Sequence, residues 1–263
     1  MSKKIGITGG SGLLGKILIK ILKKKKIKFS IYRKDIRNLK EIKRWLIKNK
    51  DIDTIFHLAA IVPIKNVNNN KKKSVNINFN GTKNLYKTIN EFDKKIWFFF
   101  ASSAHVYQPK NKLLSEKDNL KPISFYGKTK LMSEKFLLKN KNRKINICIG
   151  RIFNIFHKNQ KKPFFYPVMM DRYKKTKNPS IKKLILKNGN SIRDFSNAEK
   201  IVEIIFKLSK KKVRGIFNIG SGKKITLLEF VRKHINHKVE SKKMIKEDMI
   251  VANVNKLKKL SII

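Results

Sequence analysis

The stretch from Ile5 to Gly15 constrains the fold more than any other part of the sequence. Within it Gly9, Gly12 and Gly15 are spaced three residues apart. The pattern predicts a short apolar strand, a tight turn and a helix that begins near Leu13. Glycine allows unusual backbone angles there and lets a ligand approach the backbone closely. Because the N–H groups at a helix N-terminus suit a pyrophosphate, the segment predicts a dinucleotide site, although the spacing alone is a weak motif.

Strand and helix patterns alternate over the first 153 residues. Apolar runs predict strands at 4–8, 27–32, 53–59, 95–102 and 144–151. Helical spacing predicts helices at 13–25, 35–49, 74–91 and 124–140, and the second would place Leu39, Ile42, Trp45 and Leu46 on one face. This alternation predicts an α/β fold with a Rossmann-type, doubly wound parallel sheet.

The pattern becomes less regular after residue 154. We expect residues 1–153 to form the Rossmann domain and residues 154–263 to form a small C-terminal lobe, with 193–222 partly returning to the sheet. Helices are expected at 197–209 and 226–234, and a strand at 216–219. Thr226 is a candidate N-cap with Glu229 three residues later. The lysine-asparagine stretch 65–73 has low complexity, so we interpret it as a mobile loop.

The net charge of +48 suggests nucleic-acid binding at first sight. However, only nine of the 65 basic residues are arginines, and the lysines occur in every helix and loop. Codon bias in an AT-rich genome explains such a composition, so we expect no specific nucleic-acid partner. An anionic substrate would still be attracted.

No apolar run is long enough for a membrane span, and no signal segment precedes the first strand. The single cysteine, Cys148, lies in an apolar run and is expected to be a buried, inert thiol. These features favour a cytoplasmic location without membrane association. We expect no metal site.

Two residues on one predicted helix could perform proton transfer. Tyr126 and Lys130 are four residues apart and therefore share a face. A nearby ammonium would lower the pKa of the phenol toward neutral pH, so Tyr126 could act as a general acid or base. Ser103 follows the strand at 95–102, at the sheet edge where ligands bind in open α/β folds, and could bond the same substrate oxygen.

The order of these segments resembles the extended short-chain dehydrogenase/reductases, the nucleotide-sugar epimerase/dehydratase group. The likeness rests on ordered motifs at 8–15, 35–37, 56–60, 78–82, 102–107, 126–130 and 151–154, followed by 193–195 and 218–222. It implies an enzyme with a catalytic triad of Ser103, Tyr126 and Lys130. It also implies an NAD(P)-binding Rossmann domain and a short, truncated substrate-binding lobe.

The resemblance further implies a role for each matching residue. The cofactor would be bound by Gly9, Gly12, Leu13, Leu14, Gly15, Arg33, Asp35, Ile36, Ala59, Ala60, Asn78, Tyr126 and Lys130. Asn154 would contact the nucleotide sugar, and Arg193 its diphosphate. Similar proteins form homodimers through the helices at 74–91 and 124–140.

The end of the second strand bears on the choice of cofactor. An acidic residue there suits NAD, whereas an arginine suits the 2′-phosphate of NADP. Arg33 therefore favours NADP slightly over NAD, although Asp35 could still reach the ribose.

Two activities share this machinery. A Ser-Ala-x-Val-Tyr sequence at 103–107 resembles the epimerases and favours epimerisation, at C4 of the sugar, over reduction of a 4-keto-sugar by NADPH. Similar dehydratases carry Asp-Glu where this chain has Ala104 and His105, which argues against dehydration. A non-catalytic member of the superfamily that binds nucleotides or RNA is the alternative of another class.

Overall fold

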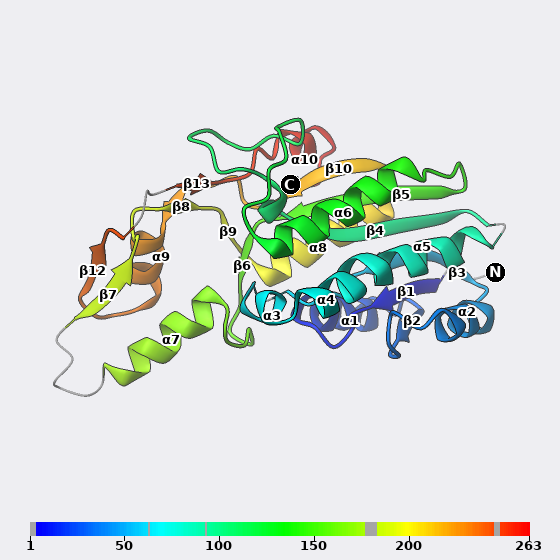
Figure 1. Cartoon of the computed structure of the whole chain (residues 1–263), viewed down its shortest axis with the longest axis horizontal. Helices are drawn as coiled ribbons and strands as arrows, with labels where there is room; N and C mark the ends of the chain where they lie inside the picture. Colours follow the sequence, from blue (N-terminus) through cyan, green and yellow to red (C-terminus); the bar gives the residue numbers. More distant parts are fainter. Residues whose placement is uncertain (1–3, 63, 93, 177–182, 245–247) are drawn as a thin grey trace.

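A computed structural model describes residues 4–62, 64–92, 94–176, 183–244 and 248–263. Its centre is a six-stranded sheet whose strands are all parallel (Figure 1). In spatial order these are β10 (Gly215–Ile219), β5 (Ile145–Ile152), β4 (Ile96–Ser103), β3 (Ile52–His57), β1 (Lys4–Thr8) and β2 (Phe29–Tyr32). The strand order reverses between β1 and β3, so the doubly wound Rossmann-type fold is confirmed.

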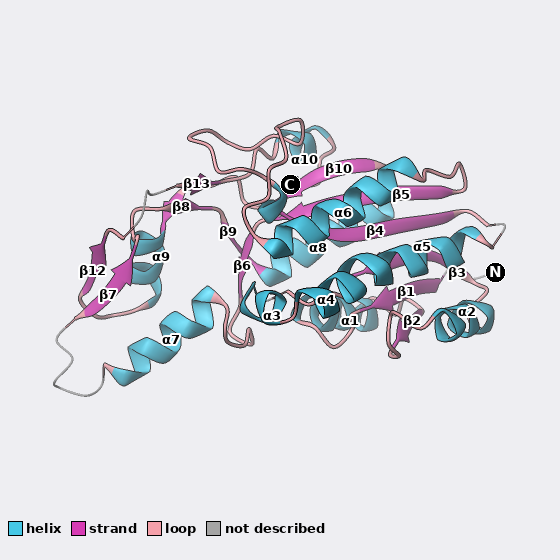
Figure 2. Ribbon diagram, in the orientation of Figure 1, coloured by secondary structure: helices cyan, strands magenta, loops and turns pink. Residues whose placement is uncertain are grey.

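Helices cover both faces of this sheet (Figure 2). On one face α1 (Leu13–Lys24), α8 (Ala198–Lys210) and α10 (Asn255–Lys259) bury residues in one apolar cluster. On the other face α2 (Leu39–Lys48), α5 (Gly81–Asn90) and α6 (Phe125–Lys139) pack around a second cluster. The strands between them read as continuous apolar runs, and every residue of β4 is buried, because both faces are covered.

The other elements that follow β5 in the chain form the C-terminal lobe and its junction with the sheet. They are α7 (Phe165–Lys175), α9 (Leu227–His234), the parallel pair β7 (Leu184–Lys187) and β12 (Val239–Lys242), and the small sheet of β11 (Ile225–Thr226), β8 (Ile192–Arg193) and β13 (Met249–Ile250). The pair β6 (Asn154–Phe156) and β9 (Phe195–Asn197) joins this lobe to the main body. The boundary between residues 153 and 154 stays a prediction, and α10 near the end of the chain packs on the main sheet.

Two local predictions were wrong. The stretch 65–73 lies in helices α3 (Ile64–Asn69) and α4 (Lys71–Val75), which lead into a π-helix (Asn76–Asn80). Tertiary contacts hold these helices despite their polar composition, because Val67 and Ser74 are fully buried. In the second case a turn precedes α2, so Leu39 is the first helical residue and is half exposed rather than part of the buried face.

Other predictions were confirmed. Thr226 and Glu229 form a reciprocal capping box at the start of α9. Cys148 is buried, which raises the pKa of its thiol well above the ordinary value. Among the described residues no helix is long and apolar enough to cross a membrane.

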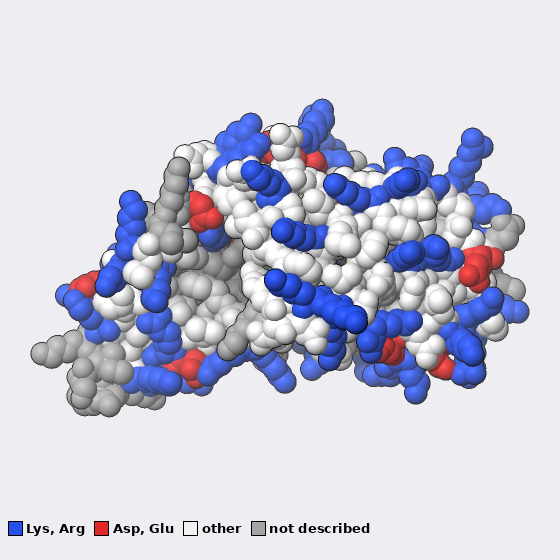
Figure 3. Space-filling model, in the orientation of Figure 1, with Lys and Arg blue, Asp and Glu red and all other residues white. Residues whose placement is uncertain are grey.

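Basic side chains are spread over the molecule rather than gathered into one stripe. Figure 3 shows lysines and arginines across the whole visible face, over the sheet domain and over the lobe. The same view shows a hollow between the lobe and the main body. The distribution agrees with the compositional explanation of the charge.

Candidate active site

The glycine-rich turn connects the end of β1 to α1. Gly9 has a φ of +75°, and a Cβ there would lie 2.5 Å from the Ala59 nitrogen. A Cβ on Gly15 would lie 2.3 Å from the Gly9 carbonyl oxygen, whereas one on Gly12 would meet only that same oxygen at 3.3 Å. Gly9 and Gly15 therefore let the turn, β3 and α1 pack closely, whereas a Cβ on Gly12 would meet a single backbone atom.

The first turn of α1 is available to an anion. Its N-cap, Gly12, offers no side-chain cap, and its first turn holds no acidic residue. N–H groups in such a first turn have no partner within the helix. Leu13 and Leu14 follow directly and are half-buried. The turn thus fits a dinucleotide pyrophosphate both in shape and in donor supply.

Ser103, Tyr126 and Lys130 meet at the carboxyl end of β4. The α6 helix begins after Ser124, whose hydroxyl accepts a hydrogen bond from the Gly127 N–H at 3.1 Å. The Ser103 hydroxyl lies beside Tyr126 and acts to lower the pKa of its phenol, and the Lys130 Nζ is 5.9 Å from the centre of the Tyr126 ring. The Lys130 Nζ donates to the Ala101 carbonyl at 2.7 Å and lies 4.9 Å from the centre of the Phe100 ring.

The expected lowering of the tyrosine pKa was wrong. Burial raises the pKa of Tyr126 to about 12, and the hydrogen bond from Ser103 opposes this only in part. Burial also lowers the pKa of Lys130 to about 7, against the opposing influence of Glu134. Burial of the two side chains thus disfavours the charged form of each, which is the phenolate of Tyr126 and the ammonium of Lys130.

A network of buried polar side chains lies next to the triad of Ser103, Tyr126 and Lys130. His57 on β3 lies between two threonine hydroxyls, with Nδ1 2.7 Å from Thr8 Oγ1 and Nε2 2.9 Å from Thr82 Oγ1. Burial, together with the Lys130 charge, lowers the pKa of His57 to about 3, so the ring is neutral. Since Thr82 donates to the Asn78 carbonyl, His57 donates through Nε2 and accepts at Nδ1.

Asn78 links the loop after β3 to α6 by hydrogen bonds. Its side chain accepts from the Ile61 N–H at 2.8 Å and donates to the Ile61 carbonyl at 3.0 Å and to Thr129 Oγ1 at 3.1 Å. The loop carries Ala59 and Ala60, both half-buried, beside the glycine turn. Because β1, β3 and β4 are parallel neighbours, these residues and the triad share one sheet edge.

The residues expected near the adenosine follow β2. Ile36 is buried, and Arg33 is exposed. The Asp35 carboxylate accepts from the Arg37 backbone N–H at 2.9 Å and from its guanidinium at 2.5 to 3.0 Å. Arg37 thereby holds the pKa of Asp35 below its usual range.

The two residues expected at the substrate lie between the lobe and the main body. Asn154 begins β6 and is half-buried, while Arg193 ends β8. The Arg193 guanidinium forms an ion pair with Asp248 at 2.7 Å and donates to the Asp248 carbonyl at 3.0 Å. Arg193 is therefore held by an acidic neighbour that the sequence analysis did not identify.

Three further residues were not identified from the sequence, although two of them, Asp194 and Arg151, stand in the motifs given above. Asp194, fully buried, accepts hydrogen bonds from Ser221, Gly222 and the Ala252 N–H, and so fixes the position of Arg193. Glu134 and Arg151 form a buried ion pair behind the triad. A signal for Glu134 was available, since it lies one helical turn beyond Lys130 on the same face.

Comparison with known proteins identifies the family. The family model described as GDP-mannose 4,6 dehydratase matches residues 14–261. GDP-6-deoxy-D-talose 4-dehydrogenase of Aggregatibacter actinomycetemcomitans is 32% identical over 229 residues, which are 83% of this chain and 74% of the relative. The chain belongs to the extended short-chain dehydrogenase/reductases. The resemblance and the expectation of an enzyme are confirmed at the level of this family.

Other members of the extended short-chain dehydrogenase/reductases match over most of the chain. The Escherichia coli dTDP-4-dehydro-6-deoxyglucose reductase is 29% identical over 95% of this chain and 86% of its own length. The solved structure of RMD from Pseudomonas aeruginosa, in complex with NADPH, matches with a TM-score of 0.86 at 18% identity, covering 98% of this chain and 91% of that one. The chain spans only about 60% of the length of three further curated relatives.

Proposed function

We propose that the chain reduces the 4-keto group of a nucleotide-linked sugar with NADPH. The observation that carries this proposal is the clustering of Ser103, Tyr126 and Lys130 at the sheet edge next to the glycine turn. The bound nicotinamide would supply the hydride to the sugar carbon. Lys130 would bond the nicotinamide ribose.

The protonation of Tyr126 supports the reductive direction. Reduction of a carbonyl needs a proton for the oxygen as well as a hydride for the carbon. With a pKa of about 12, the Tyr126 hydroxyl keeps its proton at neutral pH and can donate it. Ser103 would hold the carbonyl oxygen beside that proton, and the phenolate would then regain a proton from solvent. A base would instead require the ionised phenol, which burial disfavours.

The Asp35–Arg37 ion pair supports NADPH as the cofactor. A carboxylate after β2 would bond the ribose 2′-hydroxyl of NAD. In this chain Arg37 occupies both oxygens of that carboxylate. Arg33, exposed beside it, is then positioned to meet a 2′-phosphate, for which a planar guanidinium is well suited.

Replacing Arg33 by Ala should therefore discriminate between the two cofactors. We expect the Kd for NADPH to rise about tenfold and the Kd for NADH to change less than twofold, because a charged hydrogen bond of about 1.5 kcal/mol is lost only with the phosphate. Fluorescence titration of the two reduced cofactors measures both constants. Lys34→Ala serves as the matched control on the same loop. An equal loss of affinity for both cofactors in Arg33→Ala contradicts the assignment.

The lobe offers a place for the nucleotide part of the substrate. A groove of about 580 Å³ lies between α7 and β7. It is lined by Phe165, Met169, Ile185, Leu186 and Met244, with Arg172, Lys187 and Lys242 around them. Apolar walls suit a planar base, and the surrounding cations suit a diphosphate.

Epimerisation at C4 is the second candidate. The segment from Ser103 to Tyr107 favours it, and relatives named as UDP-glucose 4-epimerases match the chain as well. Absorbance at 340 nm with a nucleotide-4-keto-sugar separates the two activities. Stoichiometric NADPH oxidation supports the reductase. Interconversion of two nucleotide sugars without net change at 340 nm supports the epimerase and refutes the reductase.

Two further parts of the proposal concern assembly and location. We include a homodimer through α5 and α6, since Met132 is an exposed apolar side chain on α6 and Phe136 lies one turn further along the same helix. We also include a cytoplasmic location. A purely binding role is disfavoured because Ser103, Tyr126 and Lys130 are all present and lie together at the end of β4.

A further inference from the structure

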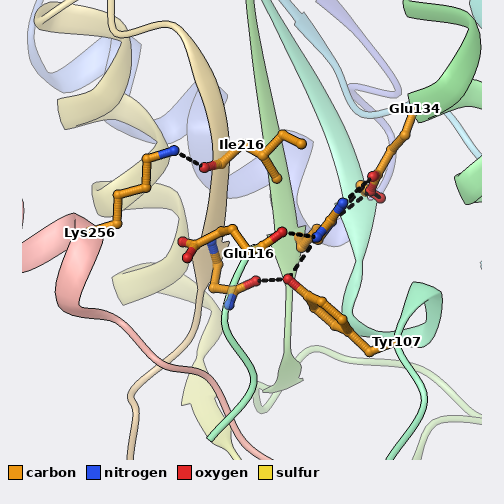
Figure 4. A network of polar contacts seen from close by, with 8 residues as sticks. Tyr107, Glu116, Glu134, Ile216 and Lys256 are labelled. Carbon is orange, nitrogen blue, oxygen red and sulfur yellow. Dashed lines mark hydrogen bonds and ion pairs between the residues drawn. The ribbon is translucent and has the colours of Figure 1, made fainter. Parts of the chain in front are cut away.

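A buried ion pair links α6 to β5 (Figure 4). Glu134 on α6 and Arg151 on β5 have 1% and 2% of their side chains exposed. The guanidinium NH2 is 2.7 Å from Glu134 Oε2, and Nε is 3.2 Å from both carboxylate oxygens. Because burial of two charges costs several kcal/mol, stability alone is a weak reason for such a pair.

Both N–H groups of Arg151 Nη1 also have partners. They donate to Tyr107 Oη at 2.8 Å and to the Glu116 carbonyl at 3.1 Å. Tyr107 Oη in turn donates to Asn218 Oδ1 at 2.6 Å, and the Asn218 N–H donates to the Glu116 carboxylate at 2.8 Å. Figure 4 shows this chain of contacts between β5, β10 and the loop that holds Glu116. The network fixes the guanidinium, and therefore the carboxylate that it binds.

Glu134 also connects α6 to the end of β4. Its Oε1 accepts a hydrogen bond from the Ser102 hydroxyl, while Lys130, one turn earlier, bonds the Ala101 carbonyl. Two successive turns of one helix face thus hold Ala101 and Ser102 near the end of β4. Ser103 and Tyr126 lie beside each other at the next residue of β4 and the preceding turn of α6.

The charge on Lys130 depends on what surrounds it. From β3 it faces His57, which is neutral, and from β4 the ring of Phe100. From its own helix it faces Tyr126, which keeps its proton, and Glu134. Burial lowers the pKa of Lys130 to about 7, and Glu134 acts in the opposite direction. Among the described groups, Glu134 is thus the carboxylate that favours the ammonium form.

We propose that Glu134, held in place by Arg151, is a positioning residue that keeps Lys130 charged and directed toward the nicotinamide ribose, and so sets the pH range in which the enzyme binds NADPH and turns over. The inference deepens the proposed reaction and rests on it for the turnover part. It assigns a task to an ion pair that contacts neither substrate nor cofactor.

The test compares two variants that remove this carboxylate. Glu134→Gln keeps the shape and can still accept from Ser102, but it leaves Arg151 unpaired and can fail to fold for that reason. The double variant Glu134→Leu, Arg151→Met removes both charges together, a change that proteins often tolerate. Glu203→Gln, on an exposed position of α8, is the control. For each protein, NADPH affinity is titrated from pH 6 to pH 9 by fluorescence, and kcat and KM are measured with the keto-sugar.

In the parent protein, NADPH affinity should fall as the pH rises, because Lys130 loses its charge. Lys130→Met should not show this pH-dependent fall in affinity (the binding limb). In both Glu134 variants we expect the limb to move to lower pH by about one unit, and kcat at pH 7.5 to fall about tenfold, because one unit changes the charged fraction by that factor. KM for the sugar should stay within about twofold.

A folded double variant with the pH profile of the parent overturns the inference, as does a limb that persists in Lys130→Met. The binding measurement needs no sugar. If the parent binds NADPH but reduces no keto-sugar, the proposed function fails, while the shift of the binding limb still decides the role of Glu134.

Discussion

Replacing Tyr126 by Phe lowers kcat by about 10²- to 10⁴-fold and leaves NADPH affinity within about threefold of the parent, if Tyr126 donates the proton in the reaction. The substitution removes one hydroxyl from a buried ring and keeps the ring contacts. It deletes the hydroxyl that lies beside Ser103, and with it the proton that the carbonyl oxygen would receive. Steady-state kinetics and fluorescence titration of NADPH measure the two quantities.

Tyr86→Phe is the matched control for this experiment. Tyr86 is also buried, and its hydroxyl donates a hydrogen bond to the Asn140 carbonyl at the far end of the helix pair. Both variants should lose about 1 kcal/mol of stability, and only Tyr126→Phe should lose turnover. A Tyr126→Phe variant with parental kcat would remove the phenol from the mechanism.

Replacing Gly15 by Ala has the second large effect, this time on the fold. The new methyl would lie 2.3 Å from the Gly9 carbonyl oxygen and 2.7 Å from Gly10 Cα. Both are backbone atoms of the turn, so the turn has to move. Alanine gains about 1 kcal/mol in helix propensity, but overpacking costs about 3 kcal/mol, and the clash decides the sign. We expect the melting temperature to fall by about 4–8 °C and NADPH binding to be lost.

Gly12→Ala separates packing from ligand approach. A Cβ at this position meets only the Gly9 carbonyl oxygen, at 3.3 Å, so the melting temperature should stay within about 3 °C of the parent. NADPH affinity should nevertheless fall at least tenfold, because the methyl stands where the pyrophosphate approaches the backbone. Calorimetry and fluorescence titration give the two values. If Gly15→Ala had the same melting temperature as the parent protein, the close approach of Gly15 to the Gly9 carbonyl oxygen would be refuted.

The sheet and most of its helices could be predicted because their signals are local. Apolar runs such as Trp97–Phe100 mark strands buried on both faces, and the glycine spacing marks the first turn. The helices at 64–75 could not be predicted in this way. Their lysine-asparagine sequence carries almost no apolar periodicity, and burial of Val67 and Ser74 depends on the tertiary structure.

The candidate site likewise has a part that local sequence patterns predict and a part that depends on tertiary contacts. Spacing on one helix brought Tyr126 and Lys130 together, and the strand end added Ser103. The direction of the Tyr126 pKa could not be predicted, since desolvation depends on everything that packs around the ring. Nor could the partners of Arg193 and Arg151, because Asp248 and Glu134 come from other elements of the chain.

The most direct test of the account follows the hydride itself. The chain is incubated with a nucleotide-4-keto-sugar and NADPH that carries deuterium at the transferred position of the nicotinamide, and the sugar product is analysed by mass spectrometry and NMR. We predict one deuterium at C4 of the sugar for each NADPH oxidised, and no transfer by Tyr126→Phe on the same timescale. Consumption of the sugar without deuterium at C4, or equal transfer by Tyr126→Phe, would contradict the account.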